Sequence, residues 1–420
     1  MELISARLKL AGLVLLTAIA AACTEKLDNS TGCPILCPDQ GGTIETVTLD
    51  AVSLDTTVSA LTGQGTETRL LLATRGDTLD SRAIIRFDSI PARYTKPGTD
   101  TTSFEITTPD SVLLRLIVDT VGSKLPGPLT LDLYDVNSDA PDSAIAPIAA
   151  LFTPARLIAT NTFAVTALKD TINVKIPGEA ILAHKGGPMR IGIRARSTAS
   201  VQLRLYSQEG AGSPSVLSFR VSPDTTVARI SLLPYSKTPA GEPILAQSLN
   251  DYTLLVKGTP AGPLNALNIG GLPASRVYMR FNVPAFLIDS VDVVRATLLL
   301  TQIPNLSLDP ADSMSIVPNL SLAGGVVTDV AKASQIIAVV NTDTLAVVPG
   351  GSGLKTLEVA TVIGLWRLQV ATETPRALVL ISTREGQSAL QSRFYSIEAA
   401  PDLRPRLRIS YSARKSTGLP

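Results

Sequence analysis

The sequence is poor in the residues that most enzymes and metal sites use. Its 420 residues include one His, three Cys and one Trp, and aromatic residues make up only 4% of the chain. His is the residue that most often serves as a general base or a metal ligand, so a single His leaves little material for either role. The sequence also lacks the Gly-x-Ser-x-Gly, His-Glu-x-x-His and phosphate-cradling motifs. These absences predict a protein that is not an enzyme.

Neither sign of charge dominates the chain. Lys and Arg number 37, Asp and Glu number 36, and the formal net charge is +1. That balance gives no electrostatic footprint for nucleic acid, so we expect no nucleic-acid partner. A hydrophobic content of 45% excludes a disordered tail, and the length predicts two or three folded domains.

The chain also lacks a hydrophobic run long enough to cross a membrane. The apolar stretch from Leu10 to Ala22 follows a basic start with Arg7 and Lys9. As a helix it would reach about 20 Å, short of a hydrocarbon core of about 30 Å. A basic start, a short apolar stretch and small residues at its end predict an export signal over residues 1–22.

The end of this segment, Ile19-Ala20-Ala21-Ala22-Cys23, resembles the bacterial lipoprotein signal. The resemblance implies that Cys23 becomes diacylated and N-terminal, and that Thr24 directs the protein to the outer membrane of the cell envelope. Ala20 departs from the family pattern, which prefers Leu there. The alternative is ordinary signal cleavage beside a coincidental Cys. Loss of residues 1–22 would leave no net charge, so a membrane partner would be reached through the lipid anchor alone.

Residues 23–44 are rich in Pro, Gly, Asn, Asp and Ser, which predicts a linker. Within it, Cys33 and Cys37 predict a disulfide that closes a short loop, because exported proteins favour disulfides. Free thiols are the alternative. A zinc site would need at least two further ligands.

Beyond residue 45 the sequence alternates with period two and then repeats itself. Residues 82–88 and 276–282 both follow a Ser, carry Arg at equivalent places and alternate inward apolar residues with outward polar ones. Further landmarks recur in the same order in both halves, which predicts a tandem duplication. We therefore predict an all-β protein with two antiparallel β-sandwich or jelly-roll domains, 45–222 and 226–413, and a tail over 414–420. Helices are predicted only over 357–368, where Trp366 lies on the apolar stripe, and over 178–184.

With its repeat laid out, the chain resembles the DNRLRE-type domain, a family of jelly-roll modules of secreted and cell-surface prokaryotic proteins. The resemblance rests on the Ser-Arg-x-x-x-Arg-Phe-Asp strand and on the stretches 254–258, 358–366 and 405–411. These motifs match better in the second half than in the first. The motifs are core and turn positions, so the resemblance implies a fold more specifically than an activity. Some members of this family are carbohydrate-binding modules.

Few residues qualify as candidate site residues. His184, before a Gly pair, is expected to cap the end of the short helix rather than act in catalysis. Asp132 and Asp135 are expected to be solvated turn acids, although a carboxylate pair for glycoside hydrolysis stays an alternative. Asp77, Asp80 and Asp88 are candidates for a calcium site, and no other cofactor is expected.

These observations predict a non-catalytic, lipid-anchored cell-envelope protein that serves as a surface binding or scaffolding module. The first alternative is a carbohydrate-binding protein for extracellular or cell-wall polysaccharide, which the low aromatic content disfavours, because sugar sites lean on exposed rings. The second is a polysaccharide hydrolase with a carboxylate pair. The expected partners are the membrane, and a polysaccharide or another envelope protein.

Overall fold

The structure is a computed structural model that describes most of the chain between residues 43 and 414. The described residues are 43–60, 64–96, 102–164, 169–210, 213–221, 227–237, 249–260, 262–305, 313–322, 337–338, 343–368 and 376–414. Thr46–Arg414 form one compact unit, and of a second unit, Met1–Glu45 with Lys415–Pro420, only residues 43–45 are described. The predicted signal peptide, almost all of the linker, and residues 415–420 lie outside the described residues.

The first sandwich packs a sheet of seven strands against a sheet of four. The larger sheet runs β12–β3–β4–β11–β8–β9, with β15 also paired to β4, and the smaller runs β10–β7–β13–β14. Leu72 of β3, Leu114 of β7 and Leu217 of β13 are fully buried in one apolar core, so the two sheets face each other. The elements of this sandwich, together with a small β5–β6 hairpin, are β3 (Arg69–Arg75), β4 (Leu79–Phe87), β5 (Arg93–Thr95), β6 (Ser103–Glu105), β7 (Pro109–Ile117), β8 (Leu129–Asp135), α2 (Ile145–Ala149), a 3₁₀ turn (Pro154–Arg156), β9 (Leu157–Phe163), β10 (Thr171–Lys175), α3 (Gly178–Ala183), β11 (Met189–Arg196), β12 (Val201–Tyr206), β13 (Val216–Val221), β14 (Ile230–Leu232) and β15 (Asp251–Lys257).

The second sandwich is built from one sheet of twelve strands that closes over its own core. Its main path is β1–β25–β18–β24–β16–β17–β23–β19–β20, with β2 on β17, β21 on β19 and β22 on β18. Leu300 of β18, Leu380 of β23 and Leu407 of β25 lie fully buried in the same core. Its elements are β1 (Ile44–Leu49), β2 (Val52–Ala60), β16 (Ala266–Gly270), β17 (Ala274–Phe281), α4 (Ala285–Asp289), β18 (Val291–Ile303), β19 (Met314–Ser321), β20 (Ile337–Ala338), β21 (Leu345–Val347), β22 (Gly353–Glu358), α6 (Ala360–Leu368), β23 (Arg376–Ser382), β24 (Gln391–Tyr395) and β25 (Arg406–Ala413).

One face of β4 is buried, as its alternating sequence predicts, but the other face, which the sequence predicts to be exposed, is buried too. Ala83, Ile85 and Phe87 point into the first core. The opposite face, predicted to be solvated, is also covered: Ile84 is fully buried in a second apolar cluster, and the Arg82 guanidinium lies 4.4 Å from the centre of the Phe152 ring. This second face is buried because α2 and the residues that follow it pack over the sheet.

The helices follow the sequence pattern with one shift. Helix α3 covers Gly178–Ala183 and ends at His184, as predicted. Helix α6 begins at Ala360 rather than at Leu357, because Leu357 and Glu358 complete β22 by pairing with β18. Trp366 is buried and its ring lies 5.2 Å from that of Phe281, which confirms its predicted place in the core. The sequence pattern missed α2 and α4, which are only five residues long each.

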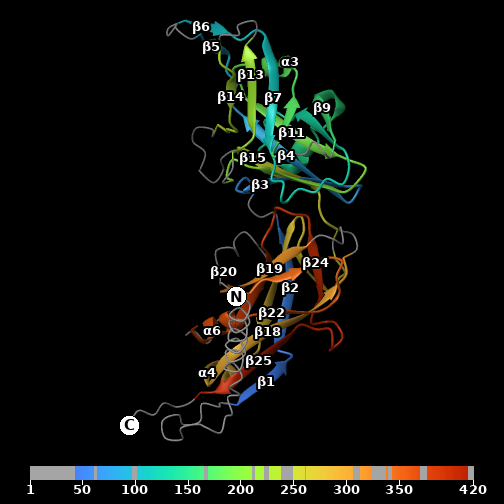
Figure 1. Cartoon of the computed structure of the whole chain (residues 1–420), viewed down its shortest axis with the longest axis vertical. Coiled ribbons are helices and arrows are strands. Elements are labelled where there is room, and N and C mark those ends of the chain that lie inside the picture. Colours follow the sequence, from blue (N-terminus) through green and yellow to red (C-terminus); the bar gives the residue numbers. More distant parts are fainter. Residues whose placement is uncertain are drawn as a thin grey trace, which may run out of the picture. The chain divides into compact units, whose positions relative to one another are not determined.

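The two sandwiches exchange strands. β1 and β2 precede the first sandwich in the chain, yet they pair with β25 and β17 of the second. β14 and β15 precede the second sandwich, yet they pair with β13 and β4 of the first. Figure 1 shows the blue β2 among the orange and red strands of the second sandwich. We call this arrangement the reciprocal strand exchange.

Strand pairing therefore crosses the predicted boundary between residues 45–222 and 226–413 in both directions. β4 and β17 are the matching Arg-Phe strands of the predicted repeats, and they accept β15 and β2 respectively. The connections that follow the exchanged strands, residues 61–68 and 258–265, are of equal length. Because the two acceptor edges are alike, each can take the strand that precedes the other sandwich, as in a domain swap within one chain. The prediction of an all-β sandwich protein with a few short helices is confirmed.

Candidate functional site

The three candidate calcium ligands do not come together. Asp80 is bound through both oxygens by Arg82, and Asp88 in the same way by Arg86, while Asp77 is exposed in the turn before β4. Asp80 lies near the start of β4 and Asp88 directly follows its end. Eight residues of strand separate them by about 26 Å, which is too far for both to bind one ion. Within the residues that the structure describes, no group of three or more His, Cys, Asp or Glu side chains could hold a metal ion. Cys23, Cys33 and Cys37 lie outside the described residues, so their predicted roles stay predictions.

The acids of β8 are separate structural anchors rather than a carboxylate pair. Asp132 is bound by the Arg196 guanidinium and accepts a hydrogen bond from the Thr160 hydroxyl at 2.9 Å. Asp135 instead faces His184. The expectation that these acids are solvated is wrong for Asp132, which is buried, because a cation approaches it from the neighbouring strand β11.

The only His in the chain is held from both sides. His184 Nδ1 lies 2.8 Å from the Pro188 carbonyl oxygen, and Nε2 lies 3.1 Å from Asp135 Oδ2. A carbonyl and a carboxylate both accept, so the two ring nitrogens donate together when the imidazole is protonated. The hydrogen bond to Asp135 raises the pKa of His184. Burial raises the pKa of Asp135, but the hydrogen bonds from His184 and from the Asn137 backbone, together with the charges of His184 and Arg156, outweigh burial and lower that pKa. His184 sits at the end of α3, as predicted, but its ring ties the helix to β8 and to the turn before β11.

A cavity of about 300 Å³ opens beside this pair, and we call it the His184 pocket. Arg156 closes one side, donating from Nη1 to the carbonyls of Asp135 and Asn137, both at 3.1 Å. Most of the remaining wall is apolar. The lining residues are Asp135, Ala155, Arg156, Leu157, Ile158, Pro177, Glu179, Ala180, Ala183, His184 and Met189. This size, with mostly apolar walls and a few polar groups, is typical of sites for small ligands.

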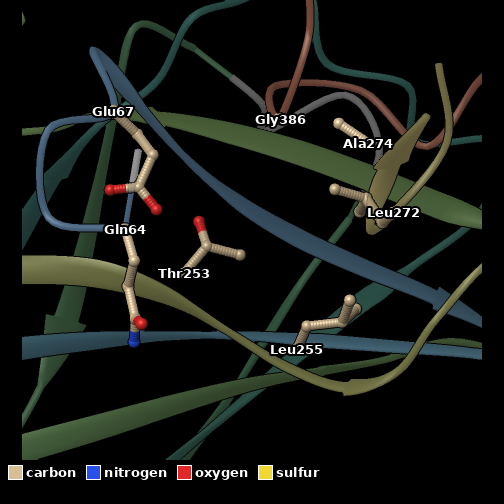
Figure 2. A pocket seen from close by; sticks show the side chains of 7 residues that line it. All are labelled: Gln64, Glu67, Thr253, Leu255, Leu272, Ala274 and Gly386. Atoms are coloured by element: carbon tan, nitrogen blue, oxygen red, sulfur yellow. The ribbon is translucent and has the colours of Figure 1, made fainter. Parts of the chain in front are cut away.

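A second, much smaller cavity lies where the two sandwiches meet. It has a volume of about 20 Å³, enough for a single water molecule. Figure 2 shows the Glu67 carboxylate and the Thr253 hydroxyl facing this space, with Leu255 and Leu272 across from them. Its remaining lining residues are Gln64, Ala274 and Gly386.

Acidic side chains gather next to this small cavity. Asp251, at the start of β15, is fully buried and accepts a hydrogen bond from the Gln208 backbone at 3.0 Å. Its other carboxylate oxygen has no hydrogen-bond partner among the described residues. Burial and the nearby Glu209 raise the pKa of Asp251 to about 8, and burial raises the pKa of Glu67 to about 7. Near neutral pH these carboxyl groups therefore bind protons that they would release in the unfolded chain.

This cluster makes stability depend on pH. The folded pKa of Asp251 lies above its unfolded value, so the folded chain holds the extra proton between about pH 4 and pH 8 and loses stability as the pH rises through that range. Replacement of Asp251 by Asn removes the charge, and we expect the unfolding free energy at pH 9 to rise relative to the wild type by about 1 kcal/mol or more. Thermal denaturation at pH 5 and pH 9 measures it, with the exposed Asp402→Asn as the matched control. An Asp251→Asn effect that is equal at both pH values would contradict this assignment.

Comparison with known proteins does not assign the chain to a family. No protein-family model matches the chain, and no curated protein matches it in a sequence search. In the described residues, none of the helices has the length and apolar character needed to span a bilayer. The resemblances to DNRLRE-type domains and to lipoprotein signals therefore stay predictions, and what the structure establishes is an all-β sandwich fold with a small-ligand-sized pocket.

Proposed function

We propose that the chain is a non-catalytic, lipid-anchored protein of the cell envelope that acts as a surface binding or scaffolding module. The observation that carries the non-catalytic part is the engagement of His184. Both of its ring nitrogens are directed at fixed acceptors within the fold, and a general base needs a nitrogen directed at the proton that it removes. The residue best suited to catalysis thus serves to position α3.

The scaffolding part is supported by the reciprocal strand exchange. Each sandwich contains strands from the other half of the chain, so a mechanical force on one sandwich is transmitted to the other through the hydrogen bonds of these strands. The binding part is supported by the His184 pocket, whose apolar walls suit a small apolar or amphipathic group.

The anchor is tested by replacing Cys23. We expect Cys23→Ser to move the protein from the membrane fraction to the soluble or secreted fraction, because the thiol that carries the lipid is lost. Fractionation and metabolic labelling with a palmitate analogue measure the change. Cys33→Ser serves as the control and should stay with the membranes. Unchanged fractionation of Cys23→Ser would refute the lipoprotein assignment.

Scaffolding and carbohydrate binding can be separated by a pull-down of the intact protein on a panel of insoluble polysaccharides. Specific retention that free oligosaccharide competes away favours the carbohydrate alternative. An absence of retention across the panel favours scaffolding.

A further inference from the structure

The position of β1 determines which sandwich the membrane anchor joins. β1 lies at the edge of the second sandwich beside β25, and Thr46 Oγ1 lies 2.8 Å from Ser410 Oγ. The chain that precedes β1 contains Cys23. Sequence order alone would attach that chain to the first sandwich, whose residues 64–221 come before those of the second sandwich. The reciprocal strand exchange attaches it to the second sandwich instead.

One end of the second sandwich carries α4, the end of α6 and the beginning of β18. Arg367 of α6 holds these parts together by donating to the Ile288 carbonyl at 2.9 Å and to the Val291 carbonyl at 2.5 Å. The last residues of β25 belong to the same end, because Tyr411 pairs with Val293 and its ring lies 6.3 Å from that of Phe286. Figure 1 shows α4, α6, β25 and β1 gathered in this part of the second sandwich.

Strand β17 separates this end of the second sandwich from the place where the second sandwich contacts the first. Leu272, just before β17, packs in one cluster with Leu71 of the first sandwich. β17 then runs to Phe281, four residues before α4 begins. Its eight residues span about 26 Å. The end with α4 and the contact with the first sandwich are thus separated by the length of this strand.

Three large apolar side chains are exposed at this end. Phe286 of α4 is 51% exposed, Val294 of β18 is 55% exposed and Leu368 at the end of α6 is 71% exposed. We call these three residues the anchor-end face. Arg367 and Arg414 flank them, both within 4 Å of the Asp292 carboxylate. Exposed single apolar residues are ordinary, but an aromatic ring and two aliphatic chains beside guanidinium groups suit the boundary between lipid headgroups and acyl chains.

The chain between Cys23 and β1 is short enough to keep this end near the bilayer. Twenty residues reach at most about 70 Å when fully extended. This covalent limit raises the local concentration of the anchor-end face at the lipid surface.

We propose that the anchor-end face docks on the lipid surface that holds the acyl chains of Cys23, so that residues 64–221 and their His184 pocket are presented away from the bilayer. This inference rests on the proposed lipid anchor. It reverses the order that the sequence suggests, since the sandwich that comes second in the chain lies next to the membrane.

Energy transfer from single dyes to labelled lipid tests the orientation. The full lipidated chain, with Cys33→Ser and Cys37→Ser, receives a dye either through Ser290→Cys beside α4 or through Asn173→Cys on β10; both positions are exposed. In vesicles of phosphatidylethanolamine and phosphatidylglycerol with a labelled acceptor lipid, we expect transfer to be several-fold stronger from position 290. Equal or stronger transfer from position 173 would overturn the orientation while leaving the anchor in place. An absence of transfer from both positions would overturn the anchor and this proposal together.

A second variant tests the face itself. Phe286→Ser with Leu368→Ser should lower transfer from position 290 by half or more without releasing the protein from the vesicles. Val121→Ser, which alters an 83% exposed apolar residue of the first sandwich, is the matched control. Unchanged transfer in the Phe286 and Leu368 variant would show that the tether alone sets the distance and would overturn docking.

Discussion

Deletion of residues 43–60 is expected to unfold the second sandwich and to leave the core of the first largely intact, although the deleted residues precede the first. The deletion removes β1 and β2, and with them the whole register that pairs β2 with β17. It also removes Ala51, which is buried in the second core, and Val47, Leu49 and Val52, which pack against that core.

The expected size of this effect follows from burial. Full burial of a large apolar side chain contributes about 1.5–3 kcal/mol, and Val47, Leu49 and Val52 are partly buried, so the loss of these residues is worth roughly 3–5 kcal/mol before the backbone pairing is counted. Domains are stable by only about 5–15 kcal/mol. Hydrogen exchange measured by mass spectrometry should therefore show lost protection over residues 266–413 and retained protection in β3, β4, β7 and β11.

Deletion of residues 24–42 is the control for chain length, and it should leave exchange in both sandwiches unchanged. If the 43–60 deletion instead exposed the first sandwich and spared the second, the reciprocal strand exchange would be wrong. The experiment thus separates the observed pairing from the order of the predicted domains.

Replacement of Asp142 by Ala is expected to cost about 3–5 kcal/mol, because it strips the partner from a buried network of charges. Asp142 is 5% exposed and accepts hydrogen bonds from Arg86 at 2.8 Å, from the Tyr252 hydroxyl at 3.0 Å and from the Leu249 backbone at 2.9 Å. Arg190 approaches it to 3.4 Å. The carboxylate therefore joins β4 and β11 to the exchanged strand β15.

Without Asp142 the buried Arg190 loses its nearby carboxylate, and two of its guanidinium nitrogens already lack a hydrogen-bond partner within the described residues. For a chain of this size, 3–5 kcal/mol corresponds to a fall in melting temperature of roughly 5 °C. Denaturation by urea and by heat measures the change. Asp139→Ala, an exposed acid three residues away, is the matched control, and an Asp142→Ala variant no less stable than this control would contradict the role assigned to the network.

Local patterning explains how much of this fold could be predicted. Period-two alternation identified the strands around residues 83–87 and 277–281, because it fixes which side chains share a face. It could not identify their partners, since an edge strand with the same pattern fits either of two similar sheets. The exchange of β2 and β15 therefore follows from tertiary pairing and lay beyond the sequence pattern.

The residues of the candidate site also fall into those that local sequence predicts and those that depend on distant parts of the chain. The position of His184 at the end of α3 could be predicted from a short helical pattern followed by two Gly residues. Its partner Asp135 could not, because it comes from β8, 49 residues away. Asp142 gave no signal at all, since Ala140-Pro141-Asp142-Ser143 is typical of a solvated turn and its burial depends on β15, more than 100 residues later.

The reciprocal strand exchange also limits how such a chain can evolve. In an ordinary tandem array, recombination can delete or add one repeat, because each repeat carries all the strands of its own fold. Here each sandwich contains strands encoded in the other repeat, so a deletion of either one leaves two unpaired sheet edges and two strands without a sheet. The two halves of the gene are therefore inherited as one unit, and the architecture can lengthen only by steps that supply matching donor strands and acceptor edges together.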